Sequence, residues 1–183
     1  MKKLLIAFTL MTLTTALAQK ALAAEDYAGN IGVSYGLSVP DYSGTTSRSI
    51  VGFQGTAKLG SEWGLGGYYM TSSKSETINS VTGDFNYQLY GVKGTYHFEG
   101  DARGVYFGAM VGISKVKAGN ISTSPTHYGL LAGYDKMLGD MFSIGGEFNY
   151  IVVGSGSTTY NNASYTVDSF NTLNFAVTGK LWF

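Results

Sequence analysis

The sequence contains no cysteine, only two prolines and few charged residues. Without cysteine the chain forms no disulfide, although small secreted domains often depend on disulfides for stability. It also has no cysteine on which a lipid anchor could be built. Asp, Glu, Lys and Arg together make up 13% of the residues, about half the usual share. So few charges cannot cover the surface of an ordinary soluble protein.

Long apolar runs are also missing, except at the N-terminus. Lys2 and Lys3 precede an apolar stretch, residues 4–17, that only threonines interrupt, and Ala21-Leu22-Ala23 then offers the small residues that a signal peptidase requires. The stretch is shorter than the ~20 apolar residues of a membrane-spanning helix. We therefore predict that residues 1–23 are a cleaved signal peptide and that residues 24–183 form the exported protein. Cleavage after Ala24 is the second choice, and a retained N-terminal anchor is the alternative.

Cleavage would leave nine basic and 12 acidic residues, a net charge of about −3. Nucleic-acid-binding proteins rely on a broad basic surface. We therefore expect no nucleic-acid partner.

What the sequence does have is glycine (26 residues), aromatic residues (14%) and alternation of apolar with small or polar residues. The alternation has a period of two, which is typical of β-strands. It occurs in eight segments: residues 27–39, 50–59, 63–71, 84–98, 104–115, 127–136, 142–153 and 169–183. In residues 84–98 the apolar positions change phase near Leu89 and Tyr90. We expect either a β-bulge there or a strand that rises beyond the bilayer.

The breaks between these segments alternate in length. Those at residues 60–62, 99–103 and 138–141 are short, and those at residues 41–49, 72–83, 117–126 and 154–168 are longer and rich in Ser, Thr, Asn and Gly. Transmembrane β-barrels have short periplasmic turns and longer external loops. A closed barrel also pairs every backbone group within the lipid. The sequence therefore predicts an all-β fold, an eight-stranded antiparallel transmembrane up-and-down β-barrel, with both termini on the periplasmic side.

Five stretches, two hairpin pairs and the C-terminal segment, resemble a known family. They are Tyr90-Gly-Val-Lys-Gly-Thr-Tyr-His-Phe98 with Gly104-Val-Tyr-Phe-Gly-Ala-Met-Val-Gly112, Tyr128-Gly-Leu-Leu-Ala-Gly-Tyr134 with Ile144-Gly-Gly-Glu-Phe-Asn-Tyr150, and the closing Phe175-Ala-Val-Thr-Gly-Lys-Leu-Trp-Phe183. They resemble the OmpX and OmpA-type eight-stranded outer-membrane barrels, and the chain looks more like the stand-alone OmpX type. The resemblance implies that the outward row Phe175, Val177, Leu181 and Phe183 is the signal that the outer-membrane assembly machinery reads.

Charged residues on the inward faces are the first candidate site. On the predicted register Lys58, Lys93, Glu147 and Lys180 point into the lumen, and Asp135 is placed to join them. Buried charges require partners, so we expect Glu147 to pair with Lys180 or with Lys93. The favoured interpretation is a polar plug, since eight strands enclose little free space. The alternative is a gate in a narrow pore.

A second candidate is catalytic. His127, with Ser122 and Ser124 upstream and Glu147 elsewhere, would supply the residue types of a hydrolase at the barrel rim, whereas His97 lies near the other end. A lipid-modifying enzyme is the least favoured function, because Glu147 is expected to lie far from that rim. No cluster has metal-ligand spacing, and we expect no metal and no cofactor.

The favoured function is therefore that of a non-enzymatic, structural outer-membrane barrel whose external loops contact other surfaces. A small-solute or ion channel is the alternative. The longest loop, residues 154–165, carries Tyr, Asn and Ser, a composition that suits contact with other molecules. The expected partners are outer-membrane lipid or lipopolysaccharide and the assembly machinery, and the expected oligomeric state is a monomer.

Overall fold

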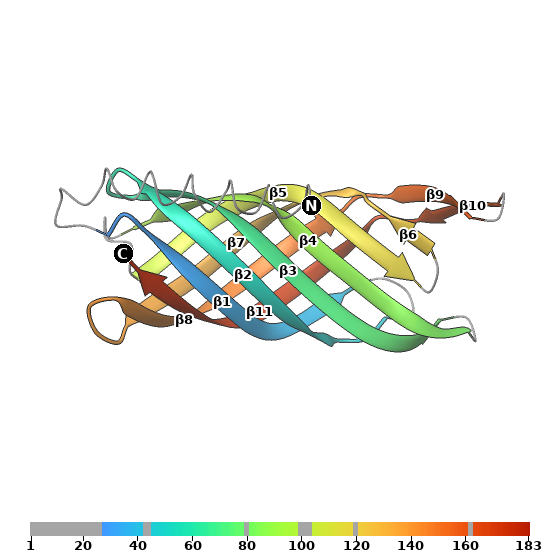
Figure 1. The fold of residues 1–183 in the computed structure, drawn as a ribbon, viewed down its shortest axis with the longest axis horizontal. Coiled ribbons are helices and arrows are strands. Elements are labelled where there is room, and N and C mark those ends of the chain that lie inside the picture. The colour runs from blue at the N-terminus through green and yellow to red at the C-terminus, as the bar shows by residue number, and fades with distance from the viewer. Residues whose placement is uncertain (1–26, 42–44, 79–80, 99–103, 119–120, 161–162) are drawn as a thin grey trace, which may run out of the picture.

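In the computed structural model, the described chain is built from antiparallel β-strands (Figure 1). The structure describes residues 27–41, 45–78, 81–98, 104–118, 121–160 and 163–183, so the predicted signal peptide lies outside the described residues. The strands are β1 (Gly29–Pro40), β2 (Arg48–Leu59), β3 (Trp63–Ile78), β4 (Val81–His97), β5 (Gly104–Ala118), β6 (Ile121–Thr123), β7 (Thr126–Met137), β8 (Phe142–Val153), β9 (Gly156–Tyr160), β10 (Ala163–Val167) and β11 (Phe170–Trp182). Within these ranges, no helix is long and apolar enough to cross a membrane.

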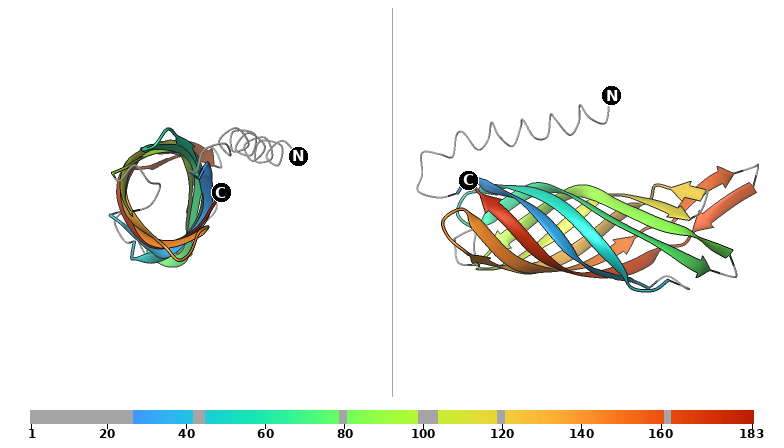
Figure 2. Two further views of the ribbon diagram at one scale, coloured as in Figure 1. Left: turned by 90° about the vertical axis from the view of Figure 1, so that its left-hand side faces the viewer. Right: turned by 60° about the horizontal axis from the view of Figure 1, so that its bottom comes forward.

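Eight of the strands close into a barrel. The hydrogen-bonded order is β4-β3-β2-β1-β11-β8-β7-β5, and β4 pairs with β5 to complete the ring. Viewed along its axis, the barrel is a continuous ring of strands (Figure 2). The predicted eight-stranded antiparallel up-and-down barrel is confirmed.

The two ends of the barrel differ. The turn end carries the turns at residues 60–62 and 138–141, and the C-terminus lies there (Figure 1). Gly60 and Gly139 have φ angles of 77° and 131°, which favour glycine. The third predicted turn, residues 99–103, lies outside the described residues. At the opposite hairpin end, the β3–β4 and β9–β10 hairpins extend beyond the barrel.

The predicted hairpin-end loops were too long. Residues 72–78 and 81–83 continue β3 and β4 in one register as far as the Ile78–Val81 pair, β6 lies within residues 117–126, and β9 and β10 lie within residues 154–168. The prediction required a regular apolar face, which segments rich in Ser and Thr do not supply. Such segments still pair through their backbones.

The predicted bulge in β4 is wrong. Residue pairing with β3 and with β5 is one-to-one throughout, so β4 keeps a single phase. Phe85, Tyr87 and Leu89 are buried inside the barrel, while Tyr90 and Val92 are exposed outside. The apolar side therefore changes from outside to inside where β4 rises toward the hairpin end. This agrees with the alternative of a strand that extends beyond the bilayer.

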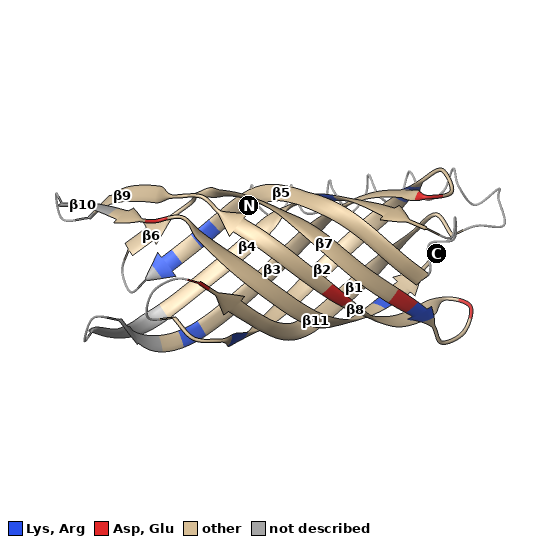
Figure 3. Cartoon of the chain, turned by 180° about the vertical axis from the view of Figure 1, so that it is seen from behind, with Lys and Arg blue, Asp and Glu red and all other residues tan. Residues whose placement is uncertain are grey.

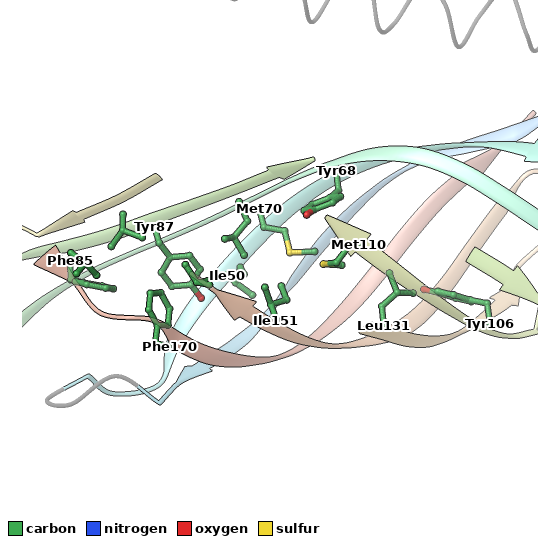
Figure 4. Packing of buried hydrophobic residues seen from close by; sticks show 14 residues of the cluster. Ile50, Tyr68, Met70, Phe85, Tyr87, Tyr106, Met110, Leu131, Ile151 and Phe170 are labelled. Atoms are coloured by element: carbon green, nitrogen blue, oxygen red, sulfur yellow. The ribbon is translucent and has the colours of Figure 1, made fainter. Parts of the chain in front are cut away.

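Apolar residues cover the outside of the barrel and also fill much of its interior. On β1, Ile31, Val33, Tyr35 and Leu37 point outward and are 50–63% exposed. Inside, an apolar cluster runs from Phe85, Tyr87 and Phe170 to Leu131 and Tyr106 (Figure 4). Near the turn end, outward aromatic rings pack edge to face: Trp63 on Tyr96, Tyr96 on Phe98 and Phe98 on Phe107, with centroids 5.1–5.4 Å apart.

Two inward glycines show why so many occur in the strands. A Cβ atom at Gly36 would lie 1.9 Å from the carbonyl oxygen of Phe175 on the neighbouring strand, so only glycine permits this close approach. A Cβ atom at Gly133 would lie 2.2 Å from Cζ of Tyr106. The first glycine accommodates backbone, and the second makes room for a lumen side chain.

Candidate functional site

Four charged residues from four strands meet inside the barrel. Lys93 of β4, Asp135 of β7, Glu147 of β8 and Lys180 of β11 all lie on the inward rows that alternation predicts, and each side chain is at most 5% exposed. Figure 3 shows how few strand positions elsewhere carry a charge. Two cations and two carboxylates make the group electrically neutral.

The charges form two ion pairs. Lys93 Nζ lies 3.1 Å from Glu147 Oε2, and Lys180 Nζ lies 2.5 Å from Asp135 Oδ2. Of the two partners that the sequence left open for Glu147, the structure places Lys93 in direct contact. Lys93 also donates to Gln54 Oε1, and Asn149 Nδ2 donates to Glu147 Oε1 over 3.2 Å. We call Lys93, Asp135, Glu147 and Lys180, with Tyr106, the lumen network.

Tyr106 joins the two ion pairs. Its hydroxyl donates to Glu147 Oε2 over 2.9 Å and accepts from Lys180 Nζ over 3.2 Å. The ammonium of Lys180 also lies 4.3 Å from the centre of the Tyr106 ring, and the His97 ring stacks on it with centroids 5.2 Å apart. The sequence interpretation missed Tyr106 because it considered only charged groups. The available signal was Gly133, the residue that pairs with Tyr106 across β5 and β7.

Lys58 lies apart from the lumen network. It is on the inward row of β2 but near the turn end, where it lines a pocket with Glu62, His97 and Trp182. The pocket volume is about 10 Å³, close to the minimum that holds one water molecule. The Glu147 carboxylate accepts hydrogen bonds from Lys93, Tyr106 and Asn149. Lys58 is not one of these donors.

The suggested hydrolase arrangement is not formed. His127 is 1% exposed inside the barrel, whereas Ser122 and Ser124 are exposed. Nε2 of His127 contacts the Tyr68 hydroxyl, and Nδ1 lies 2.9 Å from Ser114 Oγ. Glu147 is engaged in the lumen network. The prediction placed His127 at a rim, but its inward position on β7 buries it.

Arg48 is a second lumen residue that the sequence interpretation missed. Its side chain is 3% exposed, its guanidinium lies 4.7 Å from the centre of the Phe85 ring, and Nη1 donates to the Phe85 carbonyl over 3.3 Å. The predicted strand began at residue 50, two positions too late to include Arg48. Its phase with Ile50 and Gln54 was the signal that could have found it.

The seam between β1 and β11 holds the C-terminus. Phe183 accepts hydrogen bonds from Ala28 N and Gly29 N at 2.6 and 3.1 Å, and the Trp182 indole donates to Ser143 Oγ over 2.8 Å. At the hairpin end of the seam, Asp41 accepts from the backbone and side-chain nitrogens of Asn171 at 2.6 and 2.9 Å. The row read as an assembly signal points outward, with Phe175, Val177, Leu181 and Phe183 being 39–60% exposed.

Chemically, the lumen holds compensated charges and apolar packing. Across the described ranges, no group of three or more His, Cys, Asp or Glu residues is arranged to hold a metal ion. The polar side chains reach across the barrel and bond to one another. This arrangement suits a structural cross-link or a set of exchangeable ion pairs.

Comparison with known proteins gives matches in structure. No protein-family model matches the chain, and no curated protein sequence does. Neisserial surface protein A matches with a TM-score of 0.68 at 12% identity, over 85% of this chain and 97% of that one. Ail, the attachment invasion locus protein of Yersinia pestis, in complex with the heparin analogue sucrose octasulfate, matches with a TM-score of 0.58 at 15% identity, over 86% and 99%. The outer membrane protein OprG from Pseudomonas aeruginosa matches with a TM-score of 0.57 at 12% identity, over 86% and 97%. The chain therefore has the fold of the eight-stranded outer-membrane barrels, and the resemblance to the OmpX and OmpA type is confirmed at the level of the fold.

Proposed function

We propose that this chain is a non-enzymatic, integral outer-membrane protein whose sealed barrel presents the hairpin end at the cell surface. The observation that carries the proposal is the combination of an exposed apolar exterior with a lumen filled by interlocking side chains. In this proposal residues 1–23 direct export and are removed, the mature barrel is a monomer, and the assembly machinery reads the outward row that ends at Phe183.

The exterior supports a place in lipid. Soluble monomers rarely expose contiguous apolar patches larger than a few hundred Å², yet every strand position facing outward on β1 from Ile31 to Val39 is apolar and at least 44% exposed. A closed barrel leaves no unpaired strand edge in the hydrocarbon. The short turns would face the periplasm and the long hairpins the outside, as in other barrels of this kind.

The interior supports a seal. Tyr87, Leu89, Ile151 and Val153 are fully buried. The lumen network lies closer to the turn end of the barrel than these four residues do. An eight-stranded barrel is only wide enough for its side chains to fill. A structural barrel therefore needs no further plug.

The hairpin end supports contact with other surfaces. The β9–β10 hairpin carries mostly Ser, Thr and Tyr, and both it and the β3–β4 hairpin extend beyond the barrel (Figure 1). Ail, which shares the fold, is named for attachment and invasion, and its structure holds a heparin analogue. Surface contact by the hairpins is the corresponding role that we propose here.

A narrow channel is the second candidate, because the lumen network offers each lysine more than one acceptor. Lys180, for example, contacts both Asp135 and Tyr106. Single-channel recording in planar lipid bilayers separates the two functions. We expect no stepwise openings from the wild-type barrel, with insertion verified by its heat-dependent gel mobility. Regular openings would favour the channel and contradict the seal.

A further inference from the structure

The outward-facing residues of β5 change from apolar to positively charged at the hairpin end. Val105, Phe107, Val111 and Ile113 are apolar and 42–54% exposed, and the next two outward residues are Lys115 and Lys117, both exposed. Residues two apart on a strand lie ~7 Å apart on the same face. The apolar row therefore ends in two adjacent ammonium groups.

The residues that pair with them are polar and uncharged. Gln88 and Asn86 of β4 pair with Lys115 and Lys117, and Ser122 of β6 pairs with Lys117 on its other side. Neither lysine forms an ion pair with a carboxylate whose side chain the structure describes. The positive charge of this patch, which we call the β5 lysine patch, is thus available to a ligand.

Two tyrosines show at what level the patch lies. Tyr90, paired with Ile113, and Tyr128, paired with Val111, point outward and are 42% and 63% exposed. Exposed tyrosines gather at the level of the lipid headgroups. Lys115 and Lys117 follow directly beyond this level, where the phosphates of membrane lipids lie.

We propose that Lys115 and Lys117 bind the phosphate of an anionic lipid headgroup in the outer leaflet, with Gln88, Asn86 and Ser122 supplying neutral hydrogen-bonding groups around it. The inference rests on the proposed membrane location of the barrel and adds the lipid class and the residues that hold it. Charge complementarity selects the lipid, and the adjoining apolar row selects a ligand with acyl chains over a free anion.

Native mass spectrometry of the mature chain in a neutral detergent tests the proposal, with dioleoyl phosphatidic acid and dioleoyl phosphatidylcholine as probes. One lysine near an anionic membrane surface contributes roughly fivefold to binding. We expect wild-type protein to prefer phosphatidic acid by roughly 10- to 30-fold, and the Lys115→Gln/Lys117→Gln variant to lose this preference. Lys115→Arg/Lys117→Arg should keep it, since the charge is retained.

Lys136→Gln is the matched control, because Lys136 is an exposed, outward lysine of β7 at the turn end. It should keep the wild-type preference. Equal loss in Lys136→Gln, an unchanged preference in the Gln double variant, or displacement of the lipid by inorganic phosphate would each overturn the proposal. Each variant is first checked for heat-dependent gel mobility. A wild-type chain that forms no such barrel would contradict the proposed function itself, whereas an intact barrel without lipid preference overturns this inference alone.

Discussion

At the scale of single residues, the lumen network places four charges where each depends on its partner. A charge left unpaired in a buried site is strongly destabilising, and paired charges need further hydrogen bonds to offset their loss of water. Tyr106 supplies such a bond to both pairs, and Gln54 and Asn149 supply others. The network is therefore expected to respond to changes in any one member.

Glu147→Gln should lower the free energy of unfolding, because it leaves the Lys93 ammonium without its counter-charge. Breaking a buried pair from one side costs about 3–5 kcal/mol. The double variant Glu147→Gln/Lys93→Met should recover part of this loss. Urea unfolding of the barrel in lipid vesicles, followed by tryptophan fluorescence, measures both.

Asp140→Asn is the control for this substitution, because Asp140 is an exposed carboxylate in the turn before β8. It should change stability by no more than ~0.5 kcal/mol. An unfolding midpoint for Glu147→Gln equal to that of Asp140→Asn would place Glu147 outside any network that stabilises the barrel.

Gly133→Ala should disturb the same network without changing a charge. The added methyl would displace the Tyr106 ring from its bonds to Glu147 and Lys180, and overpacking of this kind costs about 1–3 kcal/mol. Gly146→Ala is the matched control on the adjacent strand, since its Cβ would meet nothing closer than 3.9 Å. If both variants unfold at the same urea concentration, Tyr106 is not held in the way the structure shows.

At the scale of elements, the strands are predictable where apolar residues alternate with small or polar ones. Residues 142–153 were predicted as a strand with the bounds that β8 has, and β3 and β5 begin at the predicted residues. Alternation weakens in the Ser- and Thr-rich segments at the hairpin end, so the extension of β3 to Ile78 and the hairpin of β9 and β10 were missed. Within the lumen, alternation shows which residues face inward but not which of them meet. That Glu147 contacts Lys93 depends on strand tilt and stagger, which no local pattern encodes.

Deletion of Phe183 should reduce insertion into the outer membrane. It removes an outward aromatic ring and the carbonyl that accepts from Ala28 and Gly29 across the closing seam. Phe183→Tyr, which keeps ring and backbone, should insert normally. Immunoblots of fractionated membranes compare the two. Wild-type yield of the deletion variant would show that the assembly signal lies elsewhere.

At the scale of the whole molecule, one β-sheet serves two environments. Its outer face is apolar, as the proposed place in lipid requires, and its inner face closes on itself through an apolar cluster and a neutral polar network. The first and last strands of the ring, β1 and β11, pair along a seam that is fastened by Asp41 and Asn171 at one end and by the C-terminal residues at the other.

Export should leave a mature chain that begins at Ala24 or Glu25. The signal-peptide pattern of residues 1–23 is the reason, and the intact mass of protein extracted from outer membranes is the measurement. A mass that includes Met1 would contradict cleavage.

The central claim is that residues 24–183 form a closed barrel in a lipid bilayer. Gel mobility of the vesicle-reconstituted chain, with and without boiling, tests it most directly, with circular dichroism of the same sample. The account predicts that the unboiled and boiled samples migrate differently and that the spectrum is dominated by β-structure. Equal mobility together with a substantially helical spectrum would contradict it.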